Sequence, residues 1–253
     1  MQLSASRLKW IISLQQKKFR EEHRVFVAEG KKVIGDLVEN GWIPQYIVTG
    51  PELQDWADDR LGSTTDIAVA DAMQMKKASG LSTPPGILAV FPVPLSSDEI
   101  SWTAPVCLLL DGIGDPGNMG TILRTAHWFG VRDIFLDHHC TDPFAPKVVQ
   151  ATMGSLAKVR LHTVADSLAL AAEARSKGVD ICFADMEGTD YRSLQRKDPL
   201  LLVLGSESHG VSEVWRAQAA FVASIPPADL SDHPDSLNVA VSASVLLSHF
   251  CCR

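Results

Sequence analysis

The sequence predicts an α/β protein with two parts: a C-terminal domain built on a mostly parallel sheet and a small N-terminal α/β domain. Short apolar runs alternate with helix-like stretches in both halves, as in a parallel sheet covered by helices on both faces. A stretch rich in proline and serine, residues 92–105, separates the halves. We therefore expect domains at 1–95 and 106–253, joined by a linker at 96–105.

Each predicted element follows from local spacing. Apolar side chains at helical spacing over 4–20 predict an amphipathic helix, and Gly41 is expected to stop a second helix that begins at Lys31. Apolar runs predict strands at 25–30, 46–50, 66–70, 86–91, 106–111, 133–137, 180–185 and 199–205. Further helices are expected at 118–130, 164–178 and 236–250.

Composition excludes several classes of protein. The chain has 253 residues with 46% hydrophobic and 21% charged residues, as in ordinary globular proteins. No apolar run is long enough to cross a bilayer, and the N-terminus lacks the features of a signal peptide. The five cysteines show no C-x-x-C spacing, so we expect neither a disulfide framework nor a metal site. A cytoplasmic protein with no membrane contact is predicted.

Charge is unevenly distributed. The net charge is -7, which argues against a generally basic nucleic-acid binder, but residues 1–32 hold eight basic and three acidic side chains. A basic face there could hold phosphates, and it could equally be a solvated helix face. The candidate RNA-binding residues are Lys17, Lys18, Arg20 and Lys32.

The first segment that could carry chemistry contains a dinucleotide-binding pattern. Gly112, Gly114 and Gly117 spell G-x-G-x-x-G after a strand, and Asp137 lies where a ribose-binding acid would sit. Against this, Pro116 and Gly117 stand where the phosphate-binding helix should begin. We expect the helix to start at Asn118, a good N-cap. The glycine pattern nevertheless leaves a nicotinamide-dependent oxidoreductase open as an alternative.

Three segments of the second half carry polar residues that could bind a ligand. Arg124 lies off the apolar stripe of the first helix, so it is either an ordinary surface residue or stands at the mouth of the glycine loop, where its guanidinium could hold a phosphate or a ribose. Glu207, in the loop Gly205–Gly210, could pair with Arg124, accept a ligand hydroxyl or lie in solvent. Ser236 is the expected N-cap of the last helix, and Asn238 could anchor a ribose hydroxyl or a carboxylate.

These segments, in this order, resemble the three motifs of the SpoU-type RNA ribose methyltransferases of the SPOUT superfamily. The matching residues are Asn118, Gly120, Arg124, Thr125, Ala126, Phe129 and Gly130, then Gly205, Glu207 and Gly210, then Ile225, Pro226, Ser236, Leu237 and Asn238. Residues 13–30 and 76–91 resemble the substrate-binding domain common in this family.

The resemblance implies a fold and an activity. The C-terminal SPOUT domain would contain a deep trefoil knot, S-adenosylmethionine would be the methyl donor, and a ribose 2'-hydroxyl of RNA would be the acceptor. The appended N-terminal RNA-binding domain favours ribosomal over transfer RNA. A homodimer with its active site near the subunit interface is also implied. An RNA-binding scaffold that lost catalysis is the other alternative.

The resemblance also implies a role for each matched residue. Gly205, Ile225 and Leu237 would line the adenosyl pocket, largely through backbone groups. Arg124 would help activate the 2'-hydroxyl or orient a phosphate beside it. The remaining residues would shape the catalytic pocket and hold Arg124 and the ribose: Asn118, Glu207, Ser236 and Asn238.

Overall fold

The computed structural model describes residues 1–61, 65–94, 100–195, 198–229 and 231–252. The chain divides into two compact units, Met1–Leu95 with Asp142–Lys158, and Ser96–Thr141 with Val159–Arg253. The expected linker at 96–105 lies partly outside the described residues, at 96–99. Within the described ranges, every helix is too short or too polar to cross a lipid bilayer.

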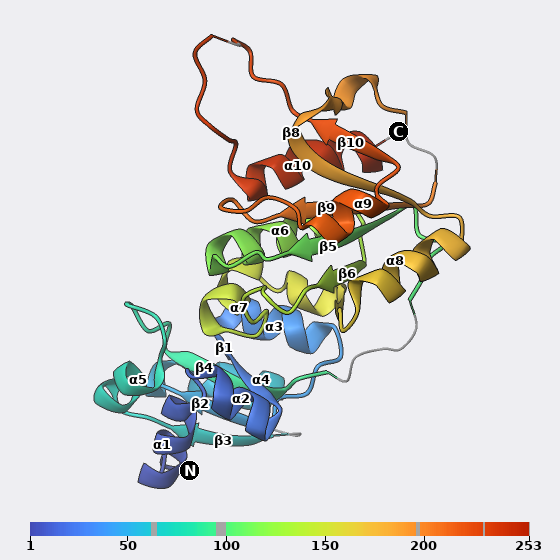
Figure 1. Ribbon diagram of the computed structural model, residues 1–253. Coiled ribbons are helices and arrows are strands. Elements are labelled where there is room, and N and C mark those ends of the chain that lie inside the picture. Colours follow the sequence, from blue (N-terminus) through green and yellow to red (C-terminus); the bar gives the residue numbers. More distant parts are fainter. Residues whose placement is uncertain (62–64, 95–99, 196–197, 230, 253) are drawn as a thin grey trace. The chain divides into compact units, whose positions relative to one another are not determined.

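The first unit is a small α/β structure around a sheet with the strand order β1-β4-β2-β3 (Figure 1). Strands β1 and β2 both run antiparallel to β4, and β3 runs parallel to β2. The strands are β1 (Val25–Glu29), β2 (Tyr46–Thr49), β3 (Asp66–Val69) and β4 (Ile87–Pro92). The helices are α1 (Ala5–Ser13), α2 (Lys17–His23), α3 (Lys31–Glu39), α4 (Gln54–Leu61), α5 (Ala72–Ala78) and α7 (Pro146–Thr152), with 3-10 turns η1 (Pro51–Leu53) and η2 (Ser155–Lys158).

Helix α7 belongs to this unit although it lies far along the chain. It contacts β1, and the ring of Phe144 lies 5.2 Å from that of Phe26. Arg20, only 4% exposed, donates from its Nε and Nη2 to Asp142 at 2.9 and 2.6 Å. Its Nη1 donates to the carbonyl oxygens of Leu14 and Gln15. The guanidinium therefore ties the segment before α7 to the end of α1, because a buried charge requires such partners.

The second unit is built on a parallel sheet, as the sequence predicts. Its described strands lie in the order β10-β8-β9-β5-β6-β7, and every neighbouring pair is parallel. The strands are β5 (Val106–Asp111), β6 (Asp133–Leu136), β7 (Arg160–Thr163), β8 (Asp180–Asp190), β9 (Leu200–Gly205) and β10 (Phe221–Ser224). The central strands β5 and β9 are buried on both faces, which explains their continuous apolar sequences.

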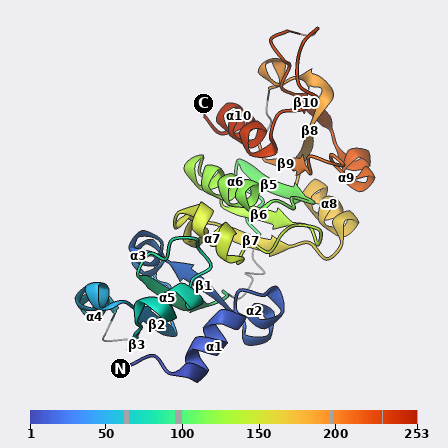
Figure 2. The same cartoon turned by 90° about the vertical axis from the view of Figure 1, so that its left-hand side faces the viewer.

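Helices cover both faces of this sheet. Figure 2 shows α6 (Pro116–Trp128) and α10 (Val239–Cys251) together on one side, with α8 (Ser167–Ser176) and α9 (Glu213–Gln218) on the other. A 3-10 turn, η3 (Tyr191–Ser193), follows β8. Trp215 of α9 is fully buried against the second face, among Leu109, Val203 and Phe183. The two helix layers leave the ends of the strands open for loops.

Several predicted boundaries are wrong. The single helix expected over 4–20 is two helices, α1 and α2. Helix α6 begins at Pro116 and not at Asn118, because Asp115 is its N-cap and proline suits the first helical position. The last helix is capped by Asn238 and not by Ser236. Both predicted N-caps are wrong, because several polar residues that can cap a helix stand close together before α6 and α10.

Asp133 at the start of β6 is a buried charged centre of the second unit. Its carboxylate is fully buried and accepts hydrogen bonds from Arg160 and from His162 Nε2, the latter at 2.9 Å. Burial by itself raises the pKa of Asp133. The hydrogen bonds from His162 and Arg160 outweigh that effect and hold the pKa below its ordinary value. Strand pairing in register, Asp133 beside Arg160, sets this contact.

Asp133→Asn should lower the free energy of unfolding at pH 7 by about 1.5–3 kcal/mol, the usual contribution of a hydrogen bond to a charged group. Because the folded-state pKa is depressed, this stabilisation is present above the unfolded pKa of about 4 and is lost as the pH falls through the folded pKa. Urea unfolding at pH 7 and at steps into acid would measure it. Asp190→Asn, which removes a partly exposed partner of Arg192, is the control and should change stability much less. A wild-type advantage over Asp133→Asn that persists unchanged into strong acid would contradict this account.

Candidate active site

The three motif segments meet at one edge of the parallel sheet. Strands β5 and β9 end in register, with Asp111 beside Gly205, and β10 ends at Ser224 in the same direction. Parallel strands bring their carboxyl ends to a single edge, which is where ligands bind in open α/β sheets. Asp111, only 8% exposed, accepts a hydrogen bond from the backbone N–H of Ser212 at 2.6 Å. This bond ties the end of β5 to the chain that follows the second motif.

The loop after β9 requires glycine at both of its ends. A Cβ on Gly205 would lie 2.2 Å from the backbone carbon of Gly210, because the loop folds back onto the end of the strand. Gly210 has a φ of +67°, in the left-handed region that favours glycine. Its N–H donates to the carbonyl oxygen of Ser206 at 2.9 Å and closes the loop. Glu207 is thereby held at an exposed tip.

Two asparagines stand at the starts of the two helices that pack together, α6 and α10. Asn118 lies in the first turn of α6, where its N–H donates to the Asp115 carboxylate at 2.8 Å. Asn238 caps α10: its Oδ1 accepts from the N–H groups of Ala240 and Val241 at 3.0 and 3.3 Å. Because the cap uses Oδ1, the amide nitrogen of Asn238 is directed away from the helix and toward other partners.

Glu207, Asn118 and Asn238 form one hydrogen-bonded network. Glu207 Oε1 accepts from Asn238 Nδ2 at 2.8 Å and from Asn118 Nδ2 at 3.1 Å. Asn238 Nδ2 also donates to Asn118 Oδ1 at 3.0 Å. The structure thus brings together one predicted residue from each of the three motifs. Among the described residues, Glu207 Oε2 has no hydrogen-bond partner, so it is available to a ligand hydroxyl or a cation.

A cavity of about 190 Å³ lies beside this network. The predicted pocket residues Gly205, Ile225 and Leu237 all line it, and so do Glu207 and Ser236. Leu204, Met186 and Val239 add apolar wall, while Asp185 adds a second carboxylate. The cavity therefore offers apolar surface and backbone polar groups with acidic groups at its boundary, which suits a ligand with a flat apolar part and a positive charge.

Asp185 and Arg216 belong to this site, and sequence reasoning missed both. Arg216 Nη2 donates to Asp185 Oδ2 at 2.7 Å, and Arg216 Nε donates to the carbonyl oxygen of Val211 at 2.8 Å. The same guanidinium lies over the ring of Phe183, 5.1 Å from its centroid. It therefore links β8, the chain after the second motif and α9. The one available signal was the position of Asp185 at the end of an apolar run, at the ligand-binding edge.

Arg124 lies apart from the network. It is exposed on α6 and, among the described residues, makes neither a hydrogen bond nor an ion pair, so its pairing with Glu207, one of the alternatives for that carboxylate, is absent. The reason is helical geometry. Six residues along an α-helix place Arg124 about 120° around the axis from Asn118. Its guanidinium is thus presented to solvent beside the site.

The candidate RNA-binding residues lie in the first unit, and one of them must be corrected. Lys17, Lys18 and Lys32 are exposed, with Lys17 near Glu21 at 3.6 Å and Lys32 near Asp36 at 3.4 Å. Arg20 was expected on this basic face, but it is buried and bonded to Asp142. A side chain in that position has no surface to offer to a phosphate.

Comparison with known proteins identifies the family. The model of the SpoU rRNA Methylase family matches residues 105–248, more than half of the chain. The chain belongs to the SpoU rRNA methylase family. The model of an MRM3-like substrate binding domain matches residues 5–89. The prediction made from the three motifs is confirmed.

Relatives of this SpoU methylase align along nearly its whole length. It is 29% identical to a 23S rRNA (uridine(2479)-2'-O)-methyltransferase of Streptomyces viridochromogenes, over 94% of this chain and 86% of that protein. It is 27% identical to the 23S rRNA (guanosine(2553)-2'-O)-methyltransferase RlmP of Bacillus subtilis, over 93% and 92%. Among solved structures, an RNA methyltransferase of the TrmH family from Porphyromonas gingivalis has a TM-score of 0.88 at 32% identity, covering 99% and 98% of the two chains.

A second solved structure bears on the cofactor. It is an AdoMet-bound rRNA methyltransferase from Sinorhizobium meliloti, 28% identical with a TM-score of 0.86, covering 98% of this chain and 95% of that one. The prediction of an S-adenosylmethionine-dependent RNA ribose methyltransferase is confirmed, and neither alternative is supported. The dinucleotide pattern also fails structurally, because the Asp115 carboxylate already caps the helix N-terminus that would bind a pyrophosphate.

Gly205→Ala should lower the stability of the SpoU methylase by about 1–3 kcal/mol or more, since the new methyl group meets rigid backbone. It should also weaken S-adenosylmethionine binding, because the loop that lines the cavity must shift. Gly114→Ala is the matched control at the same sheet edge, where a Cβ has open space. Thermal unfolding and calorimetric titration would measure both effects. Equal behaviour of the two variants would show that the loop does not need its close backbone approach.

Proposed function

We propose that this protein methylates a ribose 2'-hydroxyl of ribosomal RNA at the sheet edge where Asn118, Glu207 and Asn238 meet. The hydrogen-bonded network of these three side chains is the observation that carries the proposal, because it joins all three motifs beside one cavity. Two relatives that align along nine tenths of the chain are named as 23S rRNA 2'-O-methyltransferases, which favours ribosomal over transfer RNA.

The residues of the cavity fit S-adenosylmethionine. Leu204, Ile225 and Leu237 supply apolar surface for an adenosyl group, with backbone groups of Gly205 between them. Glu207, whose donors are neutral amides, supplies negative charge for a cationic ligand, whereas the charge of Asp185 is compensated by Arg216. When bound, the cofactor supplies an electrophilic methyl group on a sulfonium. The protein must then hold the acceptor oxygen in line with that methyl group and assist loss of its proton.

The network would position the ribose. Glu207 Oε1 accepts from two amide donors, and these bonds hold the carboxylate while Oε2 is without a hydrogen-bond partner among the described residues. That oxygen can accept a hydrogen bond from a ribose hydroxyl. The hydroxyl of Ser236, at the cavity wall, can form a further hydrogen bond with the ribose. The amides of Asn118 and Asn238 are already committed to each other and to Glu207. They therefore act as supports for the carboxylate.

Arg124 would supply positive charge. A ribose hydroxyl is a very weak acid, so a guanidinium beside it stabilises the developing alkoxide or orients the neighbouring phosphate. Its exposure and its lack of a partner among the described residues leave all its donors available to RNA. Because arginine stays protonated, we assign it an electrostatic and positioning role, not that of a base.

A homodimer that completes the site is part of the proposal. Trp128 of α6 is 84% exposed and Val241 of α10 is 47% exposed, on two helices that pack together. A hollow of about 600 Å³ lies at the same pair of helices, lined by Phe129, Tyr191 and Val245 among others. Exposed aromatic and apolar side chains of this kind are typical of subunit interfaces. Arg124, which faces away from its own network, could then serve the site from beside the interface.

Other parts of the family resemblance remain proposals. The division into an RNA-binding part at 1–95 and a methyltransferase part at 106–253 is supported by the two family models, although α7 packs with the first part. The trefoil knot is supported by membership of the SpoU family over residues 105–248. A cytoplasmic location is supported by the thiols of Cys107 and Cys182, which are buried and unpaired.

The direct test maps 2'-O-methylated nucleotides in ribosomal and transfer RNA from cells with and without this protein. Loss of one modification from ribosomal RNA, restored by the purified enzyme with S-adenosylmethionine, is the expected result. Loss confined to transfer RNA would overturn the choice of substrate. Light scattering of the purified protein at micromolar concentration tests the dimer. The mass of two chains is expected, and the mass of one chain would contradict the proposal.

Arg124→Ala should reduce methyl transfer by about a hundredfold or more, the usual effect of losing a charge-stabilising donor. Arg124→Lys should also be poor, because an ammonium cannot reproduce the planar fork. Since Arg124 is exposed and unpaired among the described residues, melting temperature and cofactor affinity should stay near those of the wild type. Arg175→Ala, which removes an exposed arginine from α8, is the control for lost charge. Near-normal methylation by Arg124→Ala at saturating RNA would refute this role.

Replacing Lys17, Lys18 and Lys32 together by alanine should weaken RNA binding and lower the slope of log K against log salt by about 2 to 3, if each lysine neutralises one phosphate. Cofactor affinity should not change. Arg20→Ala should behave differently: it should cost about 3–5 kcal/mol of stability, because it leaves Asp142 without its buried partner. Filter binding over a salt series and thermal unfolding separate the two effects. An unchanged salt slope in the triple variant would show that these lysines form a solvated face and do not bind phosphates.

A further inference from the structure

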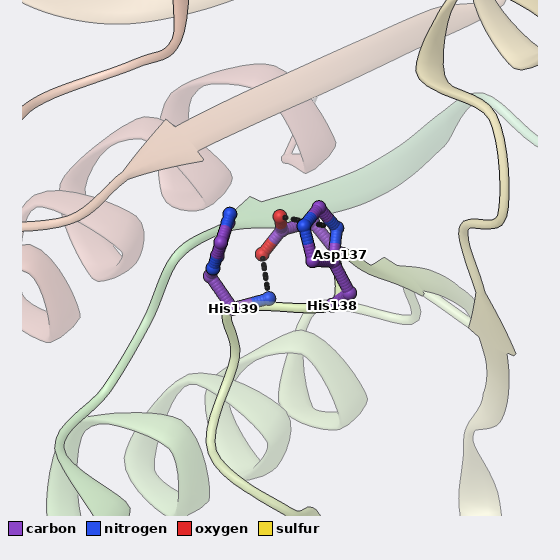
Figure 3. Close-up of side chains that lie close together, drawn as sticks. All are labelled: Asp137, His138 and His139. Carbon is purple, nitrogen blue, oxygen red and sulfur yellow. Dashed lines mark hydrogen bonds and ion pairs between the residues drawn. The ribbon is translucent and has the colours of Figure 1, made fainter.

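The turn after β6 places a carboxylate and two imidazoles together, and the proposed methyl transfer assigns no role to them. Asp137, His138 and His139 each offer one ligand atom, and these three atoms lie within 4.8 Å of one another. The two rings are 3.9 Å apart between centroids, although both are exposed. Figure 3 shows both rings standing beside the carboxylate.

The carboxylate is held in a fixed orientation by the backbone. Asp137 Oδ1 accepts from the N–H groups of Gly112 and His139 at 2.9 and 3.0 Å. Its Oδ2 lies 3.5 Å from His138 Nδ1. The turn itself is closed by Cys140 N donating to the carbonyl oxygen of Asp137 at 3.2 Å. Hydrogen bonds to one carboxylate oxygen are the kind of support that orients a metal-ligating group.

The two histidines have the freedom that a ligand needs to close on an ion. The side chain of Asp137 is 7% exposed, while that of His138 is 74% exposed. A zinc ion with bonds of about 2.0–2.1 Å needs ligand atoms roughly 3.3 Å apart. Rotation of two exposed rings about their side-chain bonds can supply that approach without movement of the backbone.

We propose that Asp137, His138 and His139 form a binding site for a zinc-like divalent transition-metal ion, with water in the remaining coordination positions. Two imidazoles and one carboxylate are ligands that suit Zn²⁺, whereas Mg²⁺ and Ca²⁺ take oxygen ligands. The proposal stands apart from methyl transfer and from the cofactor cavity.

The bound ion would act on the loop that leads to the first motif. Asp137 Oδ1 holds Gly112, and Cys140 Sγ accepts from the N–H of Ile113 at 3.3 Å. The N–H of Thr141 donates to the carbonyl oxygen of Ile113 at 2.9 Å. An ion that fixes the 137–140 turn therefore restrains residues 112–113, shortly before the start of α6. The expected consequence is a more stable loop at this edge of the sheet.

The test titrates ZnCl₂ into the chelator-treated full-length protein by calorimetry. We expect one site per chain, and His138→Ala and His139→Ala should each weaken binding at least about tenfold. His23→Ala, which removes an exposed histidine of the first unit, should bind as the wild type does. Zn²⁺ should raise the melting temperature of the wild type and of His23→Ala, and should raise that of His138→Ala and His139→Ala less, since an ion that binds the folded chain stabilises it.

Two further measurements keep the proposal falsifiable. Titration with MgCl₂ should give no binding at the same concentrations. With Co²⁺ as a spectroscopic probe, the wild type should show visible absorption that His139→Ala loses. These two histidine variants change exposed side chains, so folding is not in question. Absence of Zn²⁺ binding by the wild type, wild-type affinity in both histidine variants, or equal binding of Mg²⁺ would each overturn the proposal.

Discussion

The site depends on one interaction: a single oxygen, Glu207 Oε1, accepts two amide hydrogen bonds. Its donors, Asn118 and Asn238, are 120 residues apart in the sequence and hydrogen-bond to each other. The parallel sheet makes this possible, because β5, β9 and β10 deliver their following loops to one edge. With Oε1 engaged by both amides, Oε2 is the carboxylate oxygen left without a partner among the described residues. The network therefore sets both the position and the direction of the acidic group.

Stability and function are coupled in the same side chains. Asn238 satisfies two N–H groups at the start of α10 with its oxygen and holds Glu207 with its nitrogen. A helix cap contributes about 1 kcal/mol of stability by itself. Replacing Asn238 would therefore change the stability of the protein as well as the site. Gly205 and Gly210 show the same coupling, since the backbone approach that stabilises the loop also forms the cavity wall. The site is thus built from groups that the fold already requires.

The motifs predicted which residues lie close together but not their geometry. Asn118, Glu207 and Asn238 were assigned to one pocket from motifs alone, and they do lie together. Pairing of Arg124 with Glu207 was one of three alternatives, and the sequence could not decide among them, because residue spacing on a helix says which face a side chain takes only after the start of the helix and its neighbours are known. Arg20 was counted as a basic surface residue because sequence shows charge and not burial. Its partner, Asp142, is 122 positions away.

The sequence by itself determined the alternation of strands and helices, the glycines at strand ends and the three ordered motifs. These features are local, because the periodicity of apolar side chains and the conformational freedom of glycine act over a few residues. Tertiary structure decided which side chains meet: Arg216 with Asp185, α7 with β1, and the turn of Asp137 with Gly112. Such contacts join distant parts of the chain through sheet order and helix packing. No local pattern carries that information, since it arises only when the apolar faces of the elements are buried against one another.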